Sequence, residues 1–415
     1  MTTLPELTRA FARIGMLSFG GPAAQIALMH RELVDEKQWV TEEEYLSALS
    51  FCMLLPGPEA MQLATWIGWR KHGTLGGLIA GGLFVLPGAI IVLALSMIYA
   101  AWGTLPLVAA LFTGVQAAVL AVVVEALLRV SKRALKSRAQ WIIATLAFAA
   151  LFFFAAPFPA VILAAGLWGF FTAKSTPSTL ATALPTPWAQ SLRATAIWGA
   201  VWLVPLALIV LFAPPILADI ALFFSKLAML TFGGAYAVLT WMAQDVVQQK
   251  QWLTLPQMID GLGLAETTPG PLILVTEFVG YLAAAKQGIA MGLAGALITL
   301  WMTFAPCFLW IFAGAPWIER LTHAPRLSQA LKAITAAVVG VIANLSLWFA
   351  AHVIFASVTP LNYGPLQMIW PDPTSLNALP AALAGIAAYL LLRRHWPLPG
   401  VLALCAISSA AVAAF

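Results

Sequence analysis

Apolar stretches long enough to cross a membrane recur along the whole chain, separated only by short polar connections. A helix needs about 20 apolar residues to cross the hydrocarbon core. The first half of the chain holds six such segments, at residues 7–34, 44–69, 75–101, 106–130, 139–156 and 158–173. The second half holds six more, at 218–244, 256–284, 288–315, 333–355, 378–392 and 397–414, and an extra segment lies between the halves at 194–213. The pattern predicts an all-α polytopic membrane protein.

The chain also repeats itself at a constant spacing. Residues 11–21 (FARIGMLSFGG) are matched by residues 224–234 (FSKLAMLTFGG), and 224 minus 11 is 213. The same offset pairs Lys37-Gln38-Trp39 with Lys250-Gln251-Trp252, Thr41 with Thr254, and Pro56-Gly57-Pro58 with Pro269-Gly270-Pro271. After an insertion of six residues the offset becomes 219, which pairs Pro87 with Pro306 and Glu125 with Asn344. A fixed internal period indicates a duplicated structural unit.

The duplication predicts three parts: a first repeat at 1–173, a linker with an extra transmembrane helix at 174–217, and a second repeat at 218–415. Seven segments separate equivalent points, so the second repeat enters the membrane upside down if every segment crosses. The basic connection 129–138 has a counterpart near 362–372 that is poor in Lys and Arg, as the positive-inside rule requires of an inverted repeat. We therefore expect the connection 129–138 on the cytoplasmic side.

Composition excludes a water-soluble fold, because 62% of the residues are apolar and 9% are charged, against roughly 25% charged residues in soluble domains. The net charge of +5 is spread over short connections, which gives nucleic-acid binding no support. The three cysteines and five histidines form no cluster at ligand spacing, so we expect no metal and no cofactor. Nucleophile elbows, phosphate-binding loops and zinc-peptidase patterns are absent from the sequence, so we do not expect an enzyme.

Glycine and proline interrupt the apolar segments at four places, two in each half. These helix breaks are Gly20-Gly21-Pro22, Pro56-Gly57-Pro58, Gly233-Gly234 and Pro269-Gly270-Pro271. Irregular backbone at membrane depth belongs where it faces protein or a wet cavity. A helix that restarts after a break offers free N–H groups and a positive dipole end, which suit an anion. Kinks and close packing are the alternative, but repetition at equivalent positions favours an anion site built from broken or re-entrant helices.

Two cations and two hydroxyl groups accompany these breaks at equivalent positions. Arg13 and Lys226 each lie seven residues before a Gly-Gly pair, about 10 Å along a helix. At that depth they would attract a dianion, with snorkelling to the interface as the alternative. Ser18 and Thr231 each precede a Gly-Gly pair, with one residue in between. Their hydroxyls can donate to oxyanion oxygens or bond back to their own helix.

Carboxylates within apolar segments are candidates for proton coupling, because uptake of a proton by a buried acid changes the charge of the site. Glu59 directly follows the first Pro-Gly-Pro break, and Glu277 follows the second by six residues. Glu125 is a third candidate, but it lies close to the basic connection 129–138. An ion pair within the protein is therefore the alternative for Glu125.

Glu266 is the candidate with the best position, three residues before the second Pro-Gly-Pro break. It is followed directly by Thr267 and Thr268, whose hydroxyls can donate hydrogen bonds to an oxyanion. An ionised acid at this point repels an anionic substrate, whereas a protonated acid does not. The position therefore predicts a link between protonation and anion binding.

The motifs around the breaks resemble the chromate ion transporter family. In the first half they read FARIGMLSFGGP, KQWVTEEEY, LLPGPEAMQLATWIGWRKHG and LPGA, and in the second half FSKLAMLTFGGAY, KQWLT and ETTPGPLILVTEFVGY. The resemblance covers nearly the whole chain, as in long two-domain members. The family motif residues that it carries over are Gly20, Gly21, Pro56, Gly57, Pro58, Gly233, Gly234, Pro269, Gly270 and Pro271. One departure is Ala235-Tyr236 in place of Pro22-Ala23, so the halves are not interchangeable.

The resemblance implies a secondary active transporter that exports chromate across the bacterial cytoplasmic membrane and gives chromate resistance. It implies a multi-pass protein of the inner membrane, surrounded by lipid, with protons or another anion such as sulfate as coupling partner; a homodimer stays open. Chromate and sulfate share shape and charge, so a sulfate-type carrier is the first alternative. A passive anion channel is the second. A membrane-embedded enzyme is the third, and the clustered acids or histidines that it requires at the breaks are not seen.

Overall fold

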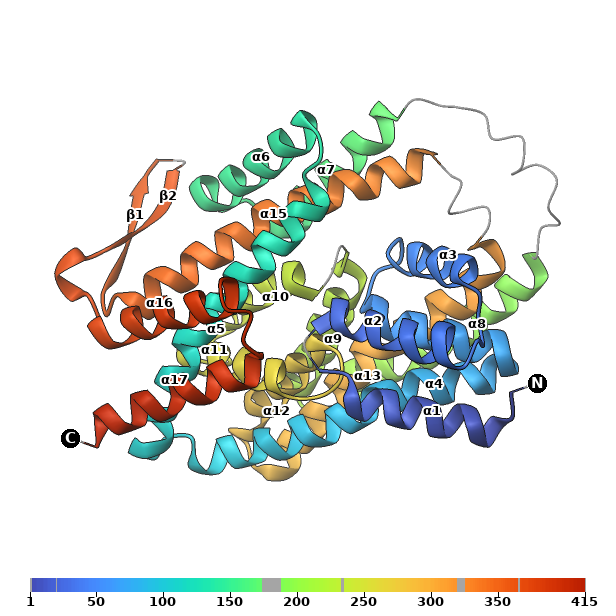
Figure 1. Ribbon diagram of the computed structural model, residues 1–415, viewed down its shortest axis with the longest axis horizontal. Coiled ribbons are helices and arrows are strands. Elements are labelled where there is room, and N and C mark those ends of the chain that lie inside the picture. The colour runs from blue at the N-terminus through green and yellow to red at the C-terminus, as the bar shows by residue number, and fades with distance from the viewer. Residues whose placement is uncertain are drawn as a thin grey trace.

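The computed structural model describes residues 2–19, 21–173, 188–232, 235–318, 325–364 and 366–414, and nearly every element within them is a helix (Figure 1). The all-α fold class is therefore confirmed. Among the described residues, five helices are long and apolar enough to cross a membrane, as expected of a multi-pass membrane protein. They are Glu59–Trp102, Pro106–Ala134, Trp188–Phe212, Ile289–Trp317 and Pro325–Ile354.

The helices of the first half follow the apolar segments and are divided at the glycine and proline motifs. Their bounds are α1 (Leu4–Leu17), α2 (Gly21–His30), the π-helix η1 (Arg31–Glu36), α3 (Glu42–Cys52), α4 (Glu59–Trp102), α5 (Pro106–Ala134), α6 (Arg138–Phe154) and α7 (Phe158–Thr172). The long helix α4 turns at His72 and Gly73, where the dihedrals are not helical. Its two limbs pack so closely that a Cβ on Gly68 would lie 2.2 Å from the carbonyl oxygen of Gly76.

The second half follows the same order of elements after the joining helix α8 (Trp188–Phe212). Its bounds are α9 (Pro215–Leu230), α10 (Ala235–Gln244), the π-helix η3 (Asp245–Gln249), α11 (Leu255–Thr267), η4 (Leu272–Leu274), α12 (Val275–Ala285), α13 (Ile289–Gly314), η5 (Ala315–Trp317), α15 (Pro325–Ile354), α16 (Ala378–Leu392) and α17 (Leu398–Ala413). Helices α12 and α13 pack together at Gly280 and Gly295, as the two limbs of α4 do at their own glycines.

Unusual backbone conformations recur at corresponding points of the two halves. Gln38 and Gln251, which are 213 positions apart, have φ of +51° and +53°. Ala155 and His395, each two residues before the proline that precedes the last helix of its half, have φ of +47° and +52°. Positive φ is uncommon outside glycine. This agreement supports a duplicated unit, while the inverted orientation and the three-part division of the chain remain predictions.

The last two helices of each half pack on the long helix of the other half. Helices α6 and α7 lie along α15, whereas α16 and α17 lie along α5 (Figure 1). Both contacts are close, because a Cβ on Gly340 would lie 2.2 Å from the Ala144 carbonyl oxygen and one on Gly114 would lie 2.1 Å from that of Cys405. The halves are therefore interlocked around one core rather than placed side by side as two separate domains.

A β-hairpin follows α15 and departs from the helical pattern. Strands β1 (Val358–Tyr363) and β2 (Leu366–Pro371) are antiparallel, with Thr359 opposite Trp370, and the short helix η6 (Pro373–Ser375) follows them. β-branched and aromatic residues favour extended backbone, and Gly364 turns the chain with φ of +60°. The hairpin lies in a connection for which the apolar pattern predicts no segment.

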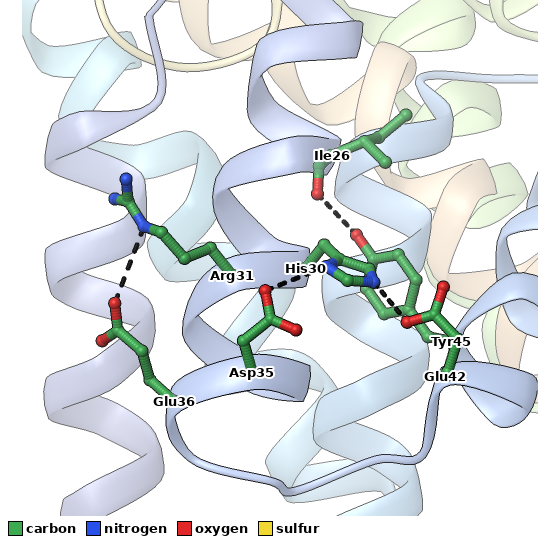
Figure 2. Close-up of polar contacts among 7 residues, drawn as sticks. All are labelled: Ile26, His30, Arg31, Asp35, Glu36, Glu42 and Tyr45. Atoms are coloured by element: carbon green, nitrogen blue, oxygen red, sulfur yellow. Dashed lines mark hydrogen bonds and ion pairs between the residues drawn. The ribbon is translucent and has the colours of Figure 1, made fainter.

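Polar contacts tie α2 and η1 to α3. The His30 ring lies between two carboxylates, with Nδ1 3.4 Å from Asp35 and Nε2 2.5 Å from Glu42 (Figure 2). Tyr45 of α3 donates its hydroxyl hydrogen to the Ile26 carbonyl oxygen at 2.6 Å. The helix after the first break is thus fixed to the helix that leads into the next break.

Candidate functional site

The helix breaks of the two halves meet in two reciprocal backbone contacts. The N–H of Gly57 donates to the carbonyl oxygen of Thr231 at 2.8 Å, and the N–H of Gly270 donates to that of Ser18 at 2.8 Å. Gly57 and Gly270 are equivalent in the repeat, and so are Ser18 and Thr231. Each Pro-Gly-Pro break therefore bonds to the end of the helix that precedes the Gly-Gly break of the other half. The structure brings these four predicted site residues together in two pairs.

Backbone conformation requires glycine at the breaks. Gly57 has φ of +122°, Gly270 has +93°, and Gly21, the first residue of α2, has +78°. Residues with a Cβ are strained at such values. Helix α4 starts immediately after the first Pro-Gly-Pro break, with Pro58 at its N-cap and Glu59 as its first residue. Because the N–H groups of a first helical turn lack helical partners, the break carries free donors and the positive end of the helix dipole.

Each Pro-Gly-Pro break packs against an equivalent point on a long helix of the other half. Gly88, next to Pro87 in α4, is so close to the second break that a Cβ on it would lie 2.1 Å from the Pro269 carbonyl oxygen. Its counterpart in α13 is Cys307, since 307 minus 88 is 219. A Cβ on Gly57 would lie 2.7 Å from the Cys307 sulfur.

Two buried glutamines hold the breaks, and the sequence analysis did not single them out. Gln25 donates from Nε2 to the Gly270 carbonyl oxygen at 2.6 Å and to that of Ser18 at 3.3 Å. Gln62 donates from Nε2 to the Pro56 carbonyl oxygen at 2.8 Å. The Oε1 atoms of both glutamines are buried without a hydrogen-bond partner. Buried polar atoms normally have partners, so each Oε1 is an acceptor available to water or to a protonated group. An amide within an apolar segment was the signal that would have found them.

The four predicted hydroxyl ligands all bond back to their own helices. Ser18 and Thr231 are buried, and each donates to the carbonyl oxygen four residues earlier, Ile14 or Leu227, at 2.7 Å. Thr267 and Thr268 donate in the same manner to carbonyl oxygens three residues earlier, at 2.8 and 3.1 Å. Their oxygen lone pairs remain as acceptors, and donation to a substrate would require each hydroxyl to rotate.

The two predicted cations lie beside acids of the π-helices. Arg13 pairs with Glu32 at 3.6 Å; the arginine side chain is 63% exposed and the glutamate side chain 2%. Lys226 lies 5.4 Å from the centre of the Trp241 ring and is close enough to Asp245 for electrostatic interaction. Glu32 and Asp245 are themselves equivalent, since 245 minus 32 is 213. The two halves thus repeat a pair made of a cation and an acid. Both cations interact with these acids rather than with the residues of the breaks.

The four predicted carboxylates differ in their surroundings. Glu277 in α12 is 1% exposed, and neither of its oxygens has a hydrogen-bond partner. Glu266 is buried near the end of α11. Glu125 forms an ion pair with Arg129 within α5, which is the alternative that the sequence left open. Glu59 lines a cavity at the start of α4.

Asp260 is a further buried acid that the sequence analysis missed. It lies in α11, is 3% exposed, and accepts a hydrogen bond from the Tyr99 hydroxyl at 2.6 Å and another from Gln116 Nε2 at 2.8 Å. These partners come from α4 and α5, so the acid joins the second half to the first. Its position as a charged residue within the apolar segment 256–284 could have identified it from the sequence.

Two cavities are lined by predicted site residues, Lys226 in one and Pro22 and Gly57 of the breaks in the other. The mixed-charge cavity has a volume of about 790 Å³, and its charged lining residues are Asp219, Lys226, Asp245 and Lys250. The basic cavity has a volume of about 460 Å³, and its charged lining residues are Glu59, Arg129, Arg133, Lys136 and Lys332. The basic cavity also includes Pro22 and Gly57, so it reaches both breaks of the first half.

Three predicted site residues, Gly20, Gly233 and Gly234, lie outside the described residues. Within the part of the chain that the structure describes, no group of three His, Cys, Asp or Glu side chains is arranged to hold a metal ion.

Comparison with known proteins gives matches over most of the chain. The family model described as "Chromate transporter" matches residues 5–170 and 218–410. A chromate transport protein of Cupriavidus metallidurans is 31% identical over 94% of this chain and 94% of its own length. A chromate transport protein of Pseudomonas aeruginosa is 34% identical over 93% and 92%, and an uncharacterized transporter of Methanocaldococcus jannaschii is 26% identical over 82% and 83%. No solved structure matches the chain.

Proposed function

Because this chain belongs to the chromate transporter family, we propose that it is a secondary active carrier that exports chromate across the bacterial inner membrane and gives chromate resistance. The curated relatives that are named chromate transport proteins support chromate as the substrate. In this proposal the repeats at 1–173 and 218–415 have opposite orientations, and residues 174–217 connect them.

The observation that carries the proposal is the reciprocal bonding of the breaks, Gly57 to Thr231 and Gly270 to Ser18. Broken helices at a repeat interface are typical of secondary transporters, whose substrate sites lie at that interface. Each bond joins one half to the other, so a movement of the halves relative to each other changes both bonds together. Such coupling would alternate access to a site at the breaks.

We assign anion binding to the breaks and to the polar groups next to them. The assigned residues are Arg13, Ser18, Gly20, Gly21, Pro56, Gly57, Pro58, Lys226, Thr231, Gly233, Gly234, Thr267, Thr268, Pro269, Gly270 and Pro271. Free N–H groups at the start of α2 and α4 would bind the oxyanion directly. Arg13 and Lys226, which are paired with acids, would act on it through their charge at longer range.

Glu277 is the strongest of the four carboxylates proposed for proton coupling. An ionised carboxylate without hydrogen bonds is very costly inside a protein within the membrane. Both oxygens of Glu277 are in that situation. A carboxyl group that takes up a proton in one state of the carrier and loses it in another would couple the proton gradient to transport.

Chromate uptake into inverted membrane vesicles tests the proposal. We expect accumulation that depends on an imposed proton gradient and that excess sulfate inhibits only weakly. Vesicles without the protein are the control. Complete inhibition of chromate uptake by sulfate would indicate that sulfate is the main substrate. Uptake that depends neither on the proton gradient nor on a counter-anion would indicate a passive channel.

A further inference from the structure

We infer that the basic cavity is a loading site, where a tetrahedral divalent oxyanion is held by Arg133 and Lys332 before it reaches the helix breaks. The inference rests on the proposed function for the identity of its ligand. It goes beyond that function because it assigns a binding site away from the breaks. Cations from both halves form the site, because Arg133 belongs to α5 and Lys332 to α15.

The basic cavity is large enough for an oxyanion with part of its water. Its volume is about 460 Å³, and a water molecule takes up roughly 30 Å³ in the liquid. Hydroxyl and amide groups, from Ser50, Ser328, Thr335 and Gln140, also line it. Ser50 and Thr335 donate to carbonyl oxygens of their own helices at 2.7 and 2.8 Å, so these hydroxyls would have to rotate to donate to an oxyanion. The side-chain amide of Gln140 can donate directly.

The charge of the basic cavity favours an anion. Four cations line it, and Glu59 is the one acid among its described lining residues. Arg129 is partly neutralised by Glu125, its ion-pair partner. Arg133, Lys136 and Lys332 have no carboxylate within ion-pair distance among the described residues. A guanidinium matches the geometry of an oxyanion edge, and an ammonium adds a point charge.

The mixed-charge cavity does not share this property. Its lining carries the two acids Asp219 and Asp245 against the two cations Lys226 and Lys250. The balance of charges gives no net attraction for a dianion. Of the two cavities, only the basic one therefore concentrates anions by its charge.

Helix α15 separates the two cavities. Ser328, Leu331, Lys332, Thr335 and Ile342 line the basic cavity, whereas Asn344 and Trp348 line the mixed-charge cavity. Successive residues of a helix are rotated by about 100°. The first group therefore falls on one face of α15, and the second group falls on the opposite face. Along this helix the linings of the two cavities come within one turn of each other, because Ile342 lines the basic cavity and Asn344 lines the mixed-charge cavity.

The position of the basic cavity fits a loading site on the cytoplasmic side. Three of its four cations, Arg129, Arg133 and Lys136, belong to the connection 129–138, which the positive-inside rule assigns to the cytoplasm. Its lining includes Pro22 and Gly57, which belong to the two first-half breaks. Arg133 is close enough to Glu59, the first residue of α4, for electrostatic interaction. An anion held by Arg133 would thus lie next to the start of that helix.

Chromate binding to the purified full-length protein tests the inference. Arg133→Gln and Lys332→Gln should each raise the Kd for chromate by about tenfold, as expected for the loss of one charge-assisted contact. Lys132→Gln is the matched control, because it removes the same charge from the same helix, and Lys132 does not line the cavity. Its Kd should stay within about twofold of the wild type. Arg133→Lys keeps the charge and should recover most of the affinity.

The outcomes separate this inference from the proposed function. Equal Kd values for Arg133→Gln, Lys332→Gln and Lys132→Gln, in a protein that binds and transports chromate, would overturn the loading site and leave the function standing. Binding of sulfate in place of chromate, with the same dependence on Arg133 and Lys332, would support the site and overturn the chromate assignment. Binding of neither anion by the wild type would overturn both. Equal thermal unfolding temperatures show that the variants are folded.

Discussion

The first half of the chain supplies three of the four cations that line the basic cavity, whereas four of the five buried acids among the described residues belong to the second half. Arg129 and Arg133 of α5 have Trp348 and His352 as counterparts in α15. Among the described residues, the buried acids of the second half are Asp245, Asp260, Glu266 and Glu277. The counterpart of Asp245 is the buried acid Glu32, whereas those of the other three are Ser47, Met53 and Ala64. The duplication has kept the positions of the breaks and of the cation and acid pairs near them, whereas the other charged groups differ between the halves.

The same division appears in the uncharged residues at the breaks. Gln25 and Gln62, which bond to the break carbonyls, have Val238 and Val275 as counterparts. The reciprocal glycine bonds remain identical in length. A backbone frame with near twofold equivalence therefore carries two different sets of side chains. In our proposal both halves bind the anion at the breaks, whereas Glu277, the strongest candidate for proton coupling, belongs to the second half.

Gly88→Ala should have the largest effect, because it disturbs the backbone contacts that the two halves share at the breaks. The new Cβ would lie 2.1 Å from the Pro269 carbonyl oxygen, so the second Pro-Gly-Pro break must move. We expect chromate transport to be lost and the free energy of unfolding to fall by about 3 kcal/mol, the upper end for overpacking. Thermal unfolding and vesicle uptake measure these effects.

Two controls accompany this substitution. Gly82→Ala lies on the same helix, where an added Cβ meets nothing within 4 Å, and it should leave transport intact. Cys307→Ala changes the counterpart in the second half and should cost about 1 kcal/mol through a small cavity. Normal transport by Gly88→Ala would show that transport tolerates a shift of the second Pro-Gly-Pro break.

Glu277→Gln should have the second largest effect, because it removes an ionisable group while keeping its size. We expect chromate uptake to lose its dependence on the proton gradient and to fall roughly a hundredfold, the lower end for the loss of a positioned proton-transfer group. Uptake by inverted vesicles with and without a gradient is the measurement. Glu43→Gln removes an exposed carboxylate of α3 and should change neither quantity. A gradient dependence that persists in Glu277→Gln would remove this residue from the coupling role.

Arg13→Ala and Lys226→Ala should have the smallest effect on transport, because both cations are paired with acids and act from a distance. We expect the KM for chromate to rise about two- to fivefold in each variant, in line with partly screened charges. Arg13→Ala also leaves Glu32 buried without its cation, which should lower stability by about 1–3 kcal/mol. Arg13→Lys separates charge from geometry. Unchanged KM values in both alanine variants would end their assignment to anion binding.

The sequence predicted those features that depend on local composition or on the repeat. The apolar segments became helices, and α1 and α3 end at the glycine and proline motifs. The alternative for Glu125 is the one that the structure bears out, since Arg129 lies one helical turn away. The β-hairpin was not predicted, because its strands carry no strong apolar alternation and only three residues separate the first strand from α15.

The contacts between the halves could not be read from the sequence. The bond from Gly57 to Thr231 spans 231 minus 57, or 174, positions, and no local pattern specifies such a partner. The basic connection 129–138 was interpreted through topology alone, and the cavity that its residues line depends on the packing of α15 against α5. Asp260 was missed because its donors, Tyr99 and Gln116, are distant in the sequence.

The reciprocal bonds also have a consequence for the order of synthesis. When Gly57 leaves the ribosome, Thr231 has not been made, and the 174 intervening positions take about 9 to 35 s at bacterial or eukaryotic elongation rates. During this interval the first half holds a buried backbone donor without its acceptor, which costs free energy in a membrane. The first half is therefore an unfinished insertion intermediate until the second half arrives, and its final shape is set late in translation.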